Sequence, residues 1–370
     1  MKEQNYIKYK SGSKSVLYMA VIIAIAITAL LYGTNNAKAA CTAENDYKQG
    51  KVYTIGPKSK PLAESIYGRV GDYNKYTRAY FTIRSYMDKF EKAKKGTLII
   101  KKGTYILTNP IRVPSNVTII FEDGVKIVKG TKNNTSGTAV SKTIFQLIKP
   151  SKSAKSNVYG KHNGEQNIHF VGKGKVEIDL KYMSGAIAIV MGHNKNVTVD
   201  NILFKNFSNG HFIEMDACKN VSITNCSFKN AKKGSDYVKE AINIDTPDRA
   251  TKGFNNDWSK HDKTPNENVL IENCKFSNMG RAIGTHKYSV KGGKQVYHDN
   301  ITVRNCKITD MKWDAPIRII NWSNSRIENV IIDGVNPEGT DSSRGIMASG
   351  VKNISIKNNT FIGMNRPIQL

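Results

Sequence analysis

Acidic side chains, a histidine and an arginine recur at matching places in four short apolar segments. The segments are His-Phe-Ile-Glu-Met-Asp (211–216), Glu-Ala-Ile-Asn-Ile-Asp (240–245), Arg-Ala-Ile-Gly-Thr-His (281–286) and Ala-Pro-Ile-Arg-Ile-Ile (315–320). Each segment has isoleucine at its third position. If the segments are stacked parallel strands with these isoleucines pointing inward, the residues one and three places later point outward.

The outward positions predicted in this way form two columns across consecutive strands. The first reads Val190, Glu214, Asn243, Gly284, Arg318, Met347 and Gln369, and the second reads Gly192, Asp216, Asp245, His286, Ile320 and Ser349. Apolar or small residues flank a polar centre in both columns, which is typical of a site rather than of a random surface. Because adjacent parallel strands lie about 4.8 Å apart, Asp216 and Asp245 are expected to be near neighbours.

Carboxylates that are packed this closely repel each other unless one is protonated or a cation lies among them. An oxygen-rich set suits Ca²⁺, so Glu214, Asp216 and Asp245 are candidate metal ligands. Carboxylates and histidine also transfer protons in general acid–base catalysis. The predicted catalytic residues are Asp216, Asp245, His286 and Arg318.

Two long loops follow these strands and are expected to form the walls of a groove. The first loop, residues 246–267, contains Trp258, and the second, residues 287–299, contains Tyr288. Aromatic rings of this kind can stack on sugar faces, and Gly284 leaves room for a ligand. The predicted substrate-binding residues are Glu214, Asn243, Arg249, Trp258, Lys287, Tyr288 and His211.

Other repeated positions predict structural roles. Glu240 and Arg281 share one position on successive strands, which favours a structural salt bridge. Cys226, Cys274 and Cys306 each follow an asparagine in the same motif. Without a Cys-x-x-Cys metal spacing, this pattern indicates small apolar side chains stacked at one turn rather than a disulfide framework.

The elements that position these residues are predicted from an internal repeat. Asparagine followed by alternating Val or Ile begins at or near Asn116, Asn167, Asn196, Asn220, Asn268, Asn300, Asn329 and Asn353. Repeats of 20–30 residues with short β-runs indicate a solenoid rather than a sandwich. Asparagine tolerates left-handed turns, and its side chain can hydrogen-bond along a stack of equivalent turns.

The chain before the repeats predicts one helix. Residues 40–71 are polar and basic, and we interpret them as a leader or a loose first turn. Residues 72–95 place apolar side chains at helical spacing, at Tyr80, Ile83, Met87 and Phe90. This pattern predicts an amphipathic helix that ends at Gly96. The period then changes to two, which indicates a long all-β body.

Three stretches resemble the pectin-lyase-like superfamily of right-handed parallel β-helices. They are Gly-Thr-Leu-Ile-Ile-Lys-Lys-Gly-Thr-Tyr-Ile-Leu (96–107), Val-Pro-Ser-Asn-Val-Thr-Ile-Ile-Phe-Glu-Asp-Gly (113–124) and Asn-Val-Ser-Ile-Thr-Asn-Cys-Ser-Phe (220–228). The resemblance implies an all-β fold, a right-handed single-stranded parallel β-helix over residues 72–370 with an N-terminal capping helix at about 72–95. It is weak for reaction because this superfamily includes lyases, hydrolases, transferases and non-catalytic fibres.

The first reaction that fits is β-elimination from an acidic polysaccharide. An acid-x-acid pair on one strand, an acid on the next and an arginine further along are similar to calcium-dependent pectate lyases, in which the arginine is the base. The resemblance implies that Arg318 removes the C5 proton of a uronate while Ca²⁺ binds nearby. His286 and Asn243 depart from that pattern. We expect a secreted enzyme of this kind.

Two alternatives remain open. The asparagine–cysteine units are also similar to those of polygalacturonases, although the catalytic motifs of that family are broken in this chain. In a glycoside hydrolase or transferase, Asp216 and Asp245 would be the acid/base pair, with His286 and Arg318 binding substrate. The other alternative is a non-catalytic β-helix that binds surface polysaccharide.

The first 39 residues have the features of a secretory signal peptide. Lysines precede an uncharged apolar run at Val16–Tyr32, and an Ala-Lys-Ala site follows at residues 37–39. Cleavage after Ala39 predicts a secreted or cell-surface protein without a stable membrane anchor. Retention of the apolar run as an anchor is the alternative, because the run approaches the length that spans a bilayer.

The charge of the chain predicts an anionic partner. The formal net charge is +26 at pH 7, and the excess is spread along the sequence. Such a surface favours polyanions, which for a secreted protein are foremost acidic polysaccharides. The chain has no recognised nucleic-acid-reading element, so no nucleic-acid partner is expected. The oligomeric state is left open.

Overall fold

The computed structural model describes residues 47–62, 71–232, 238–250, 254–336 and 342–370. The predicted signal segment lies outside these ranges. Gln49–Leu370 form one compact unit. Within the described ranges, no helix is both long and apolar enough to cross a bilayer.

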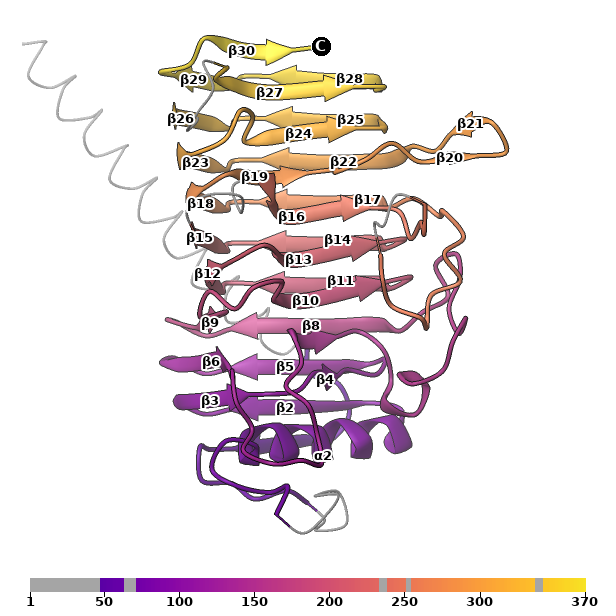
Figure 1. Ribbon diagram of the computed structural model, residues 1–370, viewed down its shortest axis with the longest axis vertical. Coiled ribbons are helices and arrows are strands. Elements are labelled where there is room, and N and C mark those ends of the chain that lie inside the picture. The colour runs from indigo at the N-terminus through magenta and orange to yellow at the C-terminus, as the bar shows by residue number, and fades with distance from the viewer. Residues whose placement is uncertain (1–46, 63–70, 233–237, 251–253, 337–341) are drawn as a thin grey trace, which may run out of the picture. The chain divides into compact units, whose positions relative to one another are not determined.

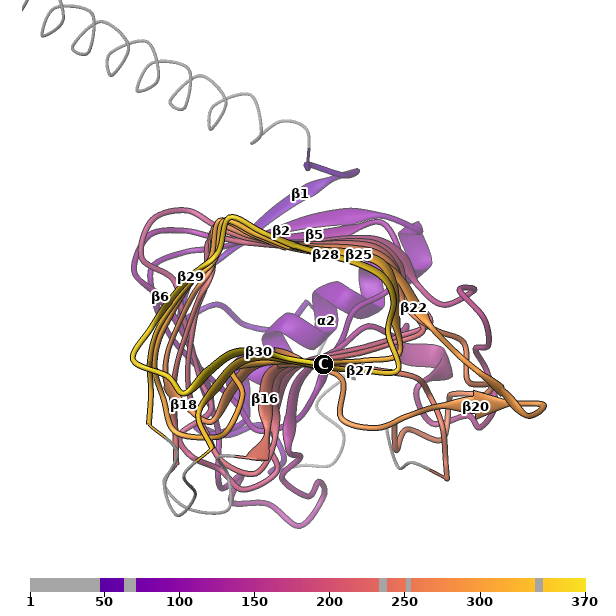
Figure 2. The same cartoon turned by 90° about the horizontal axis from the view of Figure 1, so that it is seen from above.

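Three sheets of parallel strands enclose a common core (Figures 1 and 2). Each coil of the chain adds one strand to each sheet in turn, as β11, β12 and β13 do, so sheet neighbours come from successive coils. Parallel strands are linked in this way with right-handed crossovers. The predicted all-β, right-handed parallel β-helix is confirmed.

In the part of the chain that the structure describes, sheet A contains ten strands. In spatial order they are β1 (Val52–Ile55), β2 (Gly96–Ile100), β5 (Val117–Phe121), β8 (Gln166–Gly172), β11 (Lys195–Asp200), β14 (Lys219–Thr224), β17 (Glu267–Glu272), β22 (His298–Arg304), β25 (Trp322–Glu328) and β28 (Lys352–Lys357). Because β1 pairs with β2, the stretch predicted as a leader or loose first turn already supplies a strand.

Sheet B contains nine strands. They are β3 (Gly103–Leu107), β6 (Val125–Lys129), β9 (Glu177–Asp179), β12 (Leu203–Phe207), β15 (Ser227–Ala231), β18 (Lys275–Met279), β23 (Lys307–Met311), β26 (Ile331–Val335) and β29 (Thr360–Ile362). Phenylalanines at the second position stack through the core, with Phe228 5.0 Å from Phe204 and 4.9 Å from Phe276 between ring centroids.

Sheet C, which positions the candidate site, also contains nine strands. They are β4 (Ile111–Arg112), β7 (Thr143–Gln146), β10 (Ile187–Gly192), β13 (His211–Asp216), β16 (Glu240–Asp245), β19 (Arg281–Gly284), β24 (Ile317–Ile320), β27 (Arg344–Ser349) and β30 (Arg366–Gln369). Among the described residues, the other elements include a 3₁₀ turn, η2 (Pro150–Lys152), and an antiparallel hairpin of β20 (Val290–Lys291) and β21 (Lys294–Gln295).

One helix, α2 (Arg78–Ala93), packs against β2, β3 and β4 at the N-terminal end of the coils (Figure 1). It begins six residues later than residue 72, the predicted start. Lys94 ends it in a left-handed conformation, with φ of 63°. Gly96 therefore does not end the helix. A β-carbon on Gly96 would lie 2.1 Å from the Phe90 ring, so glycine allows the helix to approach β2 closely.

Asparagine side chains form the predicted ladder along the turn into sheet A. Amide-to-amide hydrogen bonds of 2.8–3.0 Å link Asn116, Asn167, Asn196, Asn220, Asn268 and Asn300. Their φ angles lie between 54° and 58°, the left-handed region that asparagine tolerates. Asn329 was predicted to belong to this set, but its side chain bonds Asn305 at another turn. Asn353 instead donates to Asn324.

The three stacked cysteines are buried free thiols, as predicted. Cys274 interacts through its thiol with both Cys226 and Cys306 on the neighbouring coils. Burial and these contacts raise the pKa of the thiols of Cys274 and Cys306, with the Cys–Cys hydrogen bond as the largest cause. The ladder is therefore structural.

The close contact at Gly96 gives the first prediction. Gly96→Ala should destabilise the protein by about 1–3 kcal/mol, because the added methyl overpacks the helix against β2. Gly56→Ala is the matched control, since a β-carbon there meets nothing within 4 Å. Chemical denaturation measures both variants. Equal stabilities of the two would contradict the packing argument.

Candidate active site

Strand pairing confirms the isoleucine register on sheet C. Ile189, Ile213, Ile242, Ile283, Ile317, Ile346 and Ile368 pair in succession. The first predicted column pairs residue by residue from Val190 to Gln369. In the second column, Gly192, Asp216 and Asp245 pair as predicted, whereas His286 lies just beyond the end of β19.

The columns differ from the prediction in being covered rather than open. Asp216 is 0% exposed and Asp245 is 3% exposed. Over Gly192, the neighbour of Asp216, a β-carbon would meet the rings of Trp258 and Phe254 at 2.5–2.6 Å. Both rings belong to a small apolar cluster on the outside of sheet C, with Ile148, Tyr159 and Val190. The loop after β16 therefore folds back onto the sheet instead of forming an open wall.

A pocket of about 220 Å³ opens beside the covered columns. It is lined by Gly185, Ile187, Val190, Asn209, Gly210, His211, Glu214, Lys239, Asn243, Phe254, Asn255, Asn256 and His286. Four predicted site residues are thus brought together: His211, Glu214, Asn243 and His286. Lys239 and the pair Asn255–Asn256 were not predicted from the sequence, although Lys239 directly precedes the Glu240 motif.

The other predicted residues lie beneath or away from this pocket. Trp258 is only 3% exposed, so its predicted stacking on a sugar is wrong for this conformation. Arg249 and Lys287 are exposed but do not line the pocket. The hydroxyl of Tyr288 bonds that of Ser349 on β27, two coils further along.

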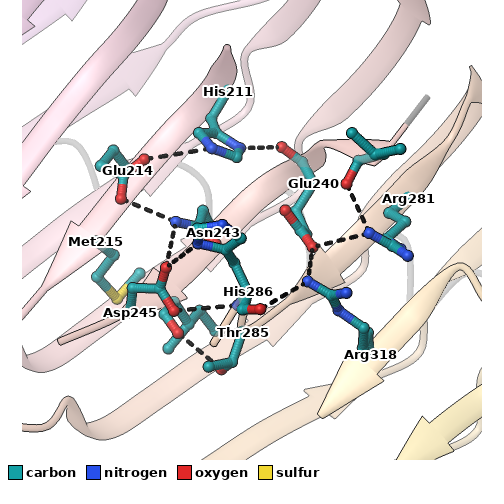
Figure 3. Close-up of polar contacts among 12 residues, drawn as sticks. His211, Glu214, Met215, Glu240, Asn243, Asp245, Arg281, Thr285, His286 and Arg318 are labelled. Atoms are coloured by element: carbon teal, nitrogen blue, oxygen red, sulfur yellow. Dashed lines mark hydrogen bonds and ion pairs between the residues drawn. The ribbon is translucent and has the colours of Figure 1, made fainter. Parts of the chain in front are cut away.

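Asp245 holds His286 in one orientation (Figure 3). His286 Nδ1 lies 3.0 Å from Asp245 Oδ2, and the His286 backbone N–H donates to Asp245 Oδ1 at 3.1 Å. Burial alone would raise the pKa of Asp245, but the bonds from His286 and Asn243 outweigh it and lower that pKa. Asp245 is therefore ionised. With Nδ1 as the donor, Nε2 of His286 is left as a proton acceptor.

Glu214 and Asp216 form a buried carboxyl pair on β13. Burial, together with the charges of the neighbouring acids, raises the pKa of both groups. Among the described residues, neither carboxyl oxygen of Asp216 has a hydrogen-bond partner. Two buried carboxylates this close would repel each other, and the pKa of Glu214 is raised to about 8, so the pair holds a proton at neutral pH.

His211 is a neutral partner of this pair. Its Nδ1 lies 2.6 Å from the carbonyl oxygen of Glu240, so Nδ1 carries the proton and donates it. Its Nε2 lies 3.5 Å from Glu214 Oε2. Burial lowers the pKa of His211. A neutral His211 accepts from a protonated carboxyl and does not ion-pair with a carboxylate.

Glu240 balances two arginines, the buried Arg281 and the half-buried Arg318. Its Oε1 lies 3.6 Å from Arg281 Nη1 and 3.1 Å from Arg318 Nη2. The predicted Glu240–Arg281 salt bridge is confirmed. Arg318 Nη2 also donates to the carbonyl oxygen of His286 at 3.1 Å. Burial lowers the pKa of Arg318, while Glu240 opposes that shift. Arg318 thus steadies the loop that carries His286.

Two of the predicted calcium ligands, Glu214 and Asp245, are already bonded to a hydrogen-bond donor. The Asn243 amide nitrogen donates to Glu214 Oε1 at 2.9 Å and to Asp245 Oδ2 at 3.2 Å. An N–H donor therefore occupies the position between the two carboxylates where a cation would lie. In the described ranges, no group of three or more His, Cys, Asp or Glu residues is arranged to hold a metal. This donor set does not suit Ca²⁺, which prefers six or more oxygens.

Comparisons with known proteins agree with the architecture. Residues 263–368 match the family model of the right-handed β-helix region. The chain is a right-handed parallel β-helix protein. Its predicted resemblance to the pectin-lyase-like superfamily is confirmed at the level of fold. A search of curated protein sequences gave no match.

Solved structures similar to this β-helix protein include two of PfbA, a surface adhesin of Streptococcus pneumoniae. One is 20% identical over 81% of this chain and 73% of that chain, with a TM-score of 0.56. The other is 18% identical over 84% of this chain and 99% of that chain, with a TM-score of 0.54. An iota-carrageenase from A. fortis is 16% identical over 82% of this chain and 58% of that chain, with a TM-score of 0.48. At these identities the likeness shows the fold alone.

The carboxyl pair gives a prediction about pH and stability. The folded protein retains a proton on Glu214 and Asp216 that the unfolded chain releases above about pH 4, so this pair lowers stability as pH rises. The free energy of unfolding of Asp216→Asn should therefore rise relative to that of the wild type as pH increases. Between pH 4 and pH 8 we expect this difference to grow by about 1 kcal/mol or more.

Urea denaturation across this pH range measures the difference in free energy of unfolding. Asp333→Asn is the control, because Asp333 is a half-buried acid on sheet B, outside the pocket. A difference between Asp216→Asn and wild type that is flat, or that shrinks with rising pH, would show that the pair is ionised in the folded protein.

Proposed function

We propose that the pocket binds an acidic polysaccharide and cleaves it by β-elimination, with His286 as the base. The observation that carries the proposal is the His286–Asp245 pair at the edge of the pocket, 3.0 Å between Nδ1 and Oδ2. A carboxylate that fixes the imidazole in this way leaves Nε2 free to take a proton and stabilises the imidazolium that forms. The side chain of His286 is 31% exposed, so a substrate can reach it.

The Glu214–Asp216 pair supplies the complementary acid. When His286 Nε2 removes the proton from C5 of a uronate, the electrons form the C4–C5 double bond and the C4–O bond breaks. The departing oxygen then takes the proton that the pair holds, through Glu214, which lines the pocket. The lowered pKa of Asp245 keeps this carboxylate ionised beside His286, and the raised pKa values of Glu214 and Asp216 keep a proton on that pair. A base and an acid are therefore available at the same pH.

A substrate carboxylate requires a cation, and Lys239 lines the pocket. Lys239 is half-buried, and its charge contributes to lowering the pKa of His211 beside it. The asparagines Asn209, Asn255 and Asn256 add amide groups that can bond sugar hydroxyls. Neutralising the carboxylate makes the C5 proton easier to remove, so Lys239 supports elimination from an acidic sugar.

The arrangement differs from both mechanisms expected from the resemblance. Arg318 as the base is disfavoured because its Nη2 is held by Glu240 and by the His286 carbonyl. A hydrolase that uses Asp216 and Asp245 is disfavoured because neither lines the pocket. No step is assigned to Ca²⁺ because its predicted ligands do not fit. His286 takes the role of base in this proposal.

Product formation tests the reaction. Unsaturated uronates absorb in the ultraviolet, so incubation with a panel of uronate polysaccharides should raise the absorbance. His286→Ala should lower the rate by about 10²–10⁴-fold, the usual contribution of a general base. His162→Ala is the control, a half-buried histidine outside the pocket whose Nε2 lies 3.0 Å from the Pro265 carbonyl oxygen. Equal rates in both variants would refute the role of His286.

A chelator tests the predicted metal. Because Glu214 and Asp245 are hydrogen-bonded to Asn243 and His286, and the Glu214–Asp216 pair holds a proton, we expect the same initial rate with EDTA as without it. Added Ca²⁺ should not change the rate of the chelated enzyme. Loss of activity with EDTA and its recovery with Ca²⁺ would instead support a calcium-dependent lyase.

A surface-binding protein is the second candidate. PfbA, which has a similar fold, is described as a surface adhesin, and the net charge of this chain favours anionic polymers. A secreted or cell-surface location belongs to both candidates and is supported by the apolar N-terminal segment. Binding of a uronate polymer without any turnover, unchanged in His286→Ala, would favour this candidate over the lyase.

A further inference from the structure

A row of lysines runs across consecutive coils on the outer face of sheet B, away from the pocket. Lys205 on β12 pairs in register with Lys229 on β15, and Lys275 on β18 pairs with Lys307 on β23. These strands follow one another in the sheet. Parallel neighbours lie about 4.8 Å apart, so the ammonium groups within each pair lie close together, while Lys229 and Lys275 are offset by two residues because Lys229 pairs with Ser277.

Only one end of this row is neutralised. Lys205 Nζ lies 2.8 Å from Glu177 Oε2 and 3.9 Å from Asp179 Oδ2. Lys229, Lys275 and Lys307, which we call the lysine row, have no acid within ion-pair distance in the described part of the chain. Like charges on directly paired residues repel each other.

Sheet A shows that the fold does not require such a row. On the corresponding coils, Lys219 Nζ lies 2.7 Å from Glu267 Oε2, and Arg304 Nε lies 2.6 Å from Glu272 Oε1. These two cations of sheet A are therefore paired with acids on the adjacent strand. Lys229, Lys275 and Lys307 of sheet B have no such acids within ion-pair distance in the described ranges, which suits a partner that supplies the negative charge.

Hydroxyl groups alternate with the lysines. In register, Ser227 pairs with Lys275, and Lys229 pairs with Ser277, which in turn pairs with Thr309. On each of β15, β18 and β23, one lysine and one hydroxyl residue thus occupy the two outward positions. A polymer of acidic sugars presents the complementary set, acidic groups and hydroxyls repeated along one line.

We propose that the lysine row is a docking surface for an anionic polysaccharide that lies along the axis of the β-helix. Single-stranded nucleic acid is disfavoured, because such sites stack bases on aromatic side chains. The outward residues of β15, β18 and β23 at these positions are serine, threonine and lysine. This binding surface lies on a different sheet from the pocket and does not depend on turnover there.

Charge-matched variants test the proposal. The triple variant K229S/K275S/K307S removes the row, and K101S/K352S/K357S removes three exposed lysines elsewhere, so both lose the same charge. Fluorescently labelled dextran sulfate is the probe, and its dissociation constant is measured by anisotropy. We expect the row variant to bind at least about tenfold more weakly and the control variant to stay within about twofold of wild type. The difference should shrink at high salt, because exposed charges are screened.

Several outcomes would overturn the proposal. Equal weakening in both variants would assign binding to net charge alone, and unchanged binding in both would exclude the row. If duplex DNA bound more tightly than dextran sulfate, and if that binding required the lysine row, the partner would belong to a different class.

The substitutions are at solvent-facing positions, and thermal denaturation checks folding. Lys275→Gln provides a milder change that should weaken binding in the same direction. Running the assay in His286→Ala separates docking from the proposed reaction, since docking should persist there.

Discussion

Backbone hydrogen bonding between successive coils is the constraint on which this structure depends. Parallel pairing places each residue about 4.8 Å from its counterpart one coil away, so like residues stack for the length of the sheet. Apolar stacks such as Phe204, Phe228 and Phe276 build the core. The same constraint brings Glu214, Asn243 and Asp245 together on the outside of β13 and β16. Core and candidate site therefore result from one rule, applied to opposite faces of the same strands.

Stacking of acids carries an energetic cost that the structure meets by different means. At Asp245, the imidazole and backbone N–H of His286 stabilise the charge. At Glu214 and Asp216, a retained proton avoids a second charge in a buried place. At Glu240, two guanidinium groups provide the balance. Groups held this far from their ordinary ionisation states commonly mark functional sites, and they persist because the surrounding coils are stable enough to tolerate them.

The fold could be predicted from the sequence because repetition is a one-dimensional signal. Isoleucine at the third position of each segment was sufficient to assign the register of sheet C, and asparagine at each turn was sufficient to indicate a solenoid. What could not be predicted depends on segments that do not repeat. The placement of Trp258 and Phe254 over Gly192 follows from how one long loop packs, and no periodicity reports that packing. The turn occupied by Asn329 was also predicted wrongly. Its sequence resembles that of the asparagines at the turn into sheet A, but its side chain bonds Asn305 at a different turn. Lys239 was missed because it lies outside the repeating unit.

The candidate site is built from residues on successive coils, which limits where a related chain can gain or lose a coil. Solenoids change length by gaining or losing whole coils, and a coil added near β28 would leave the interior of the stack intact. A coil inserted between β16 and β19 would instead move His286 away from Asp245 by one strand spacing and break their contact. Coil number is therefore free to drift at the end of the solenoid but not between β13 and β19. Homologues of different length should carry their extra coils outside this interval if they keep the histidine–aspartate pair.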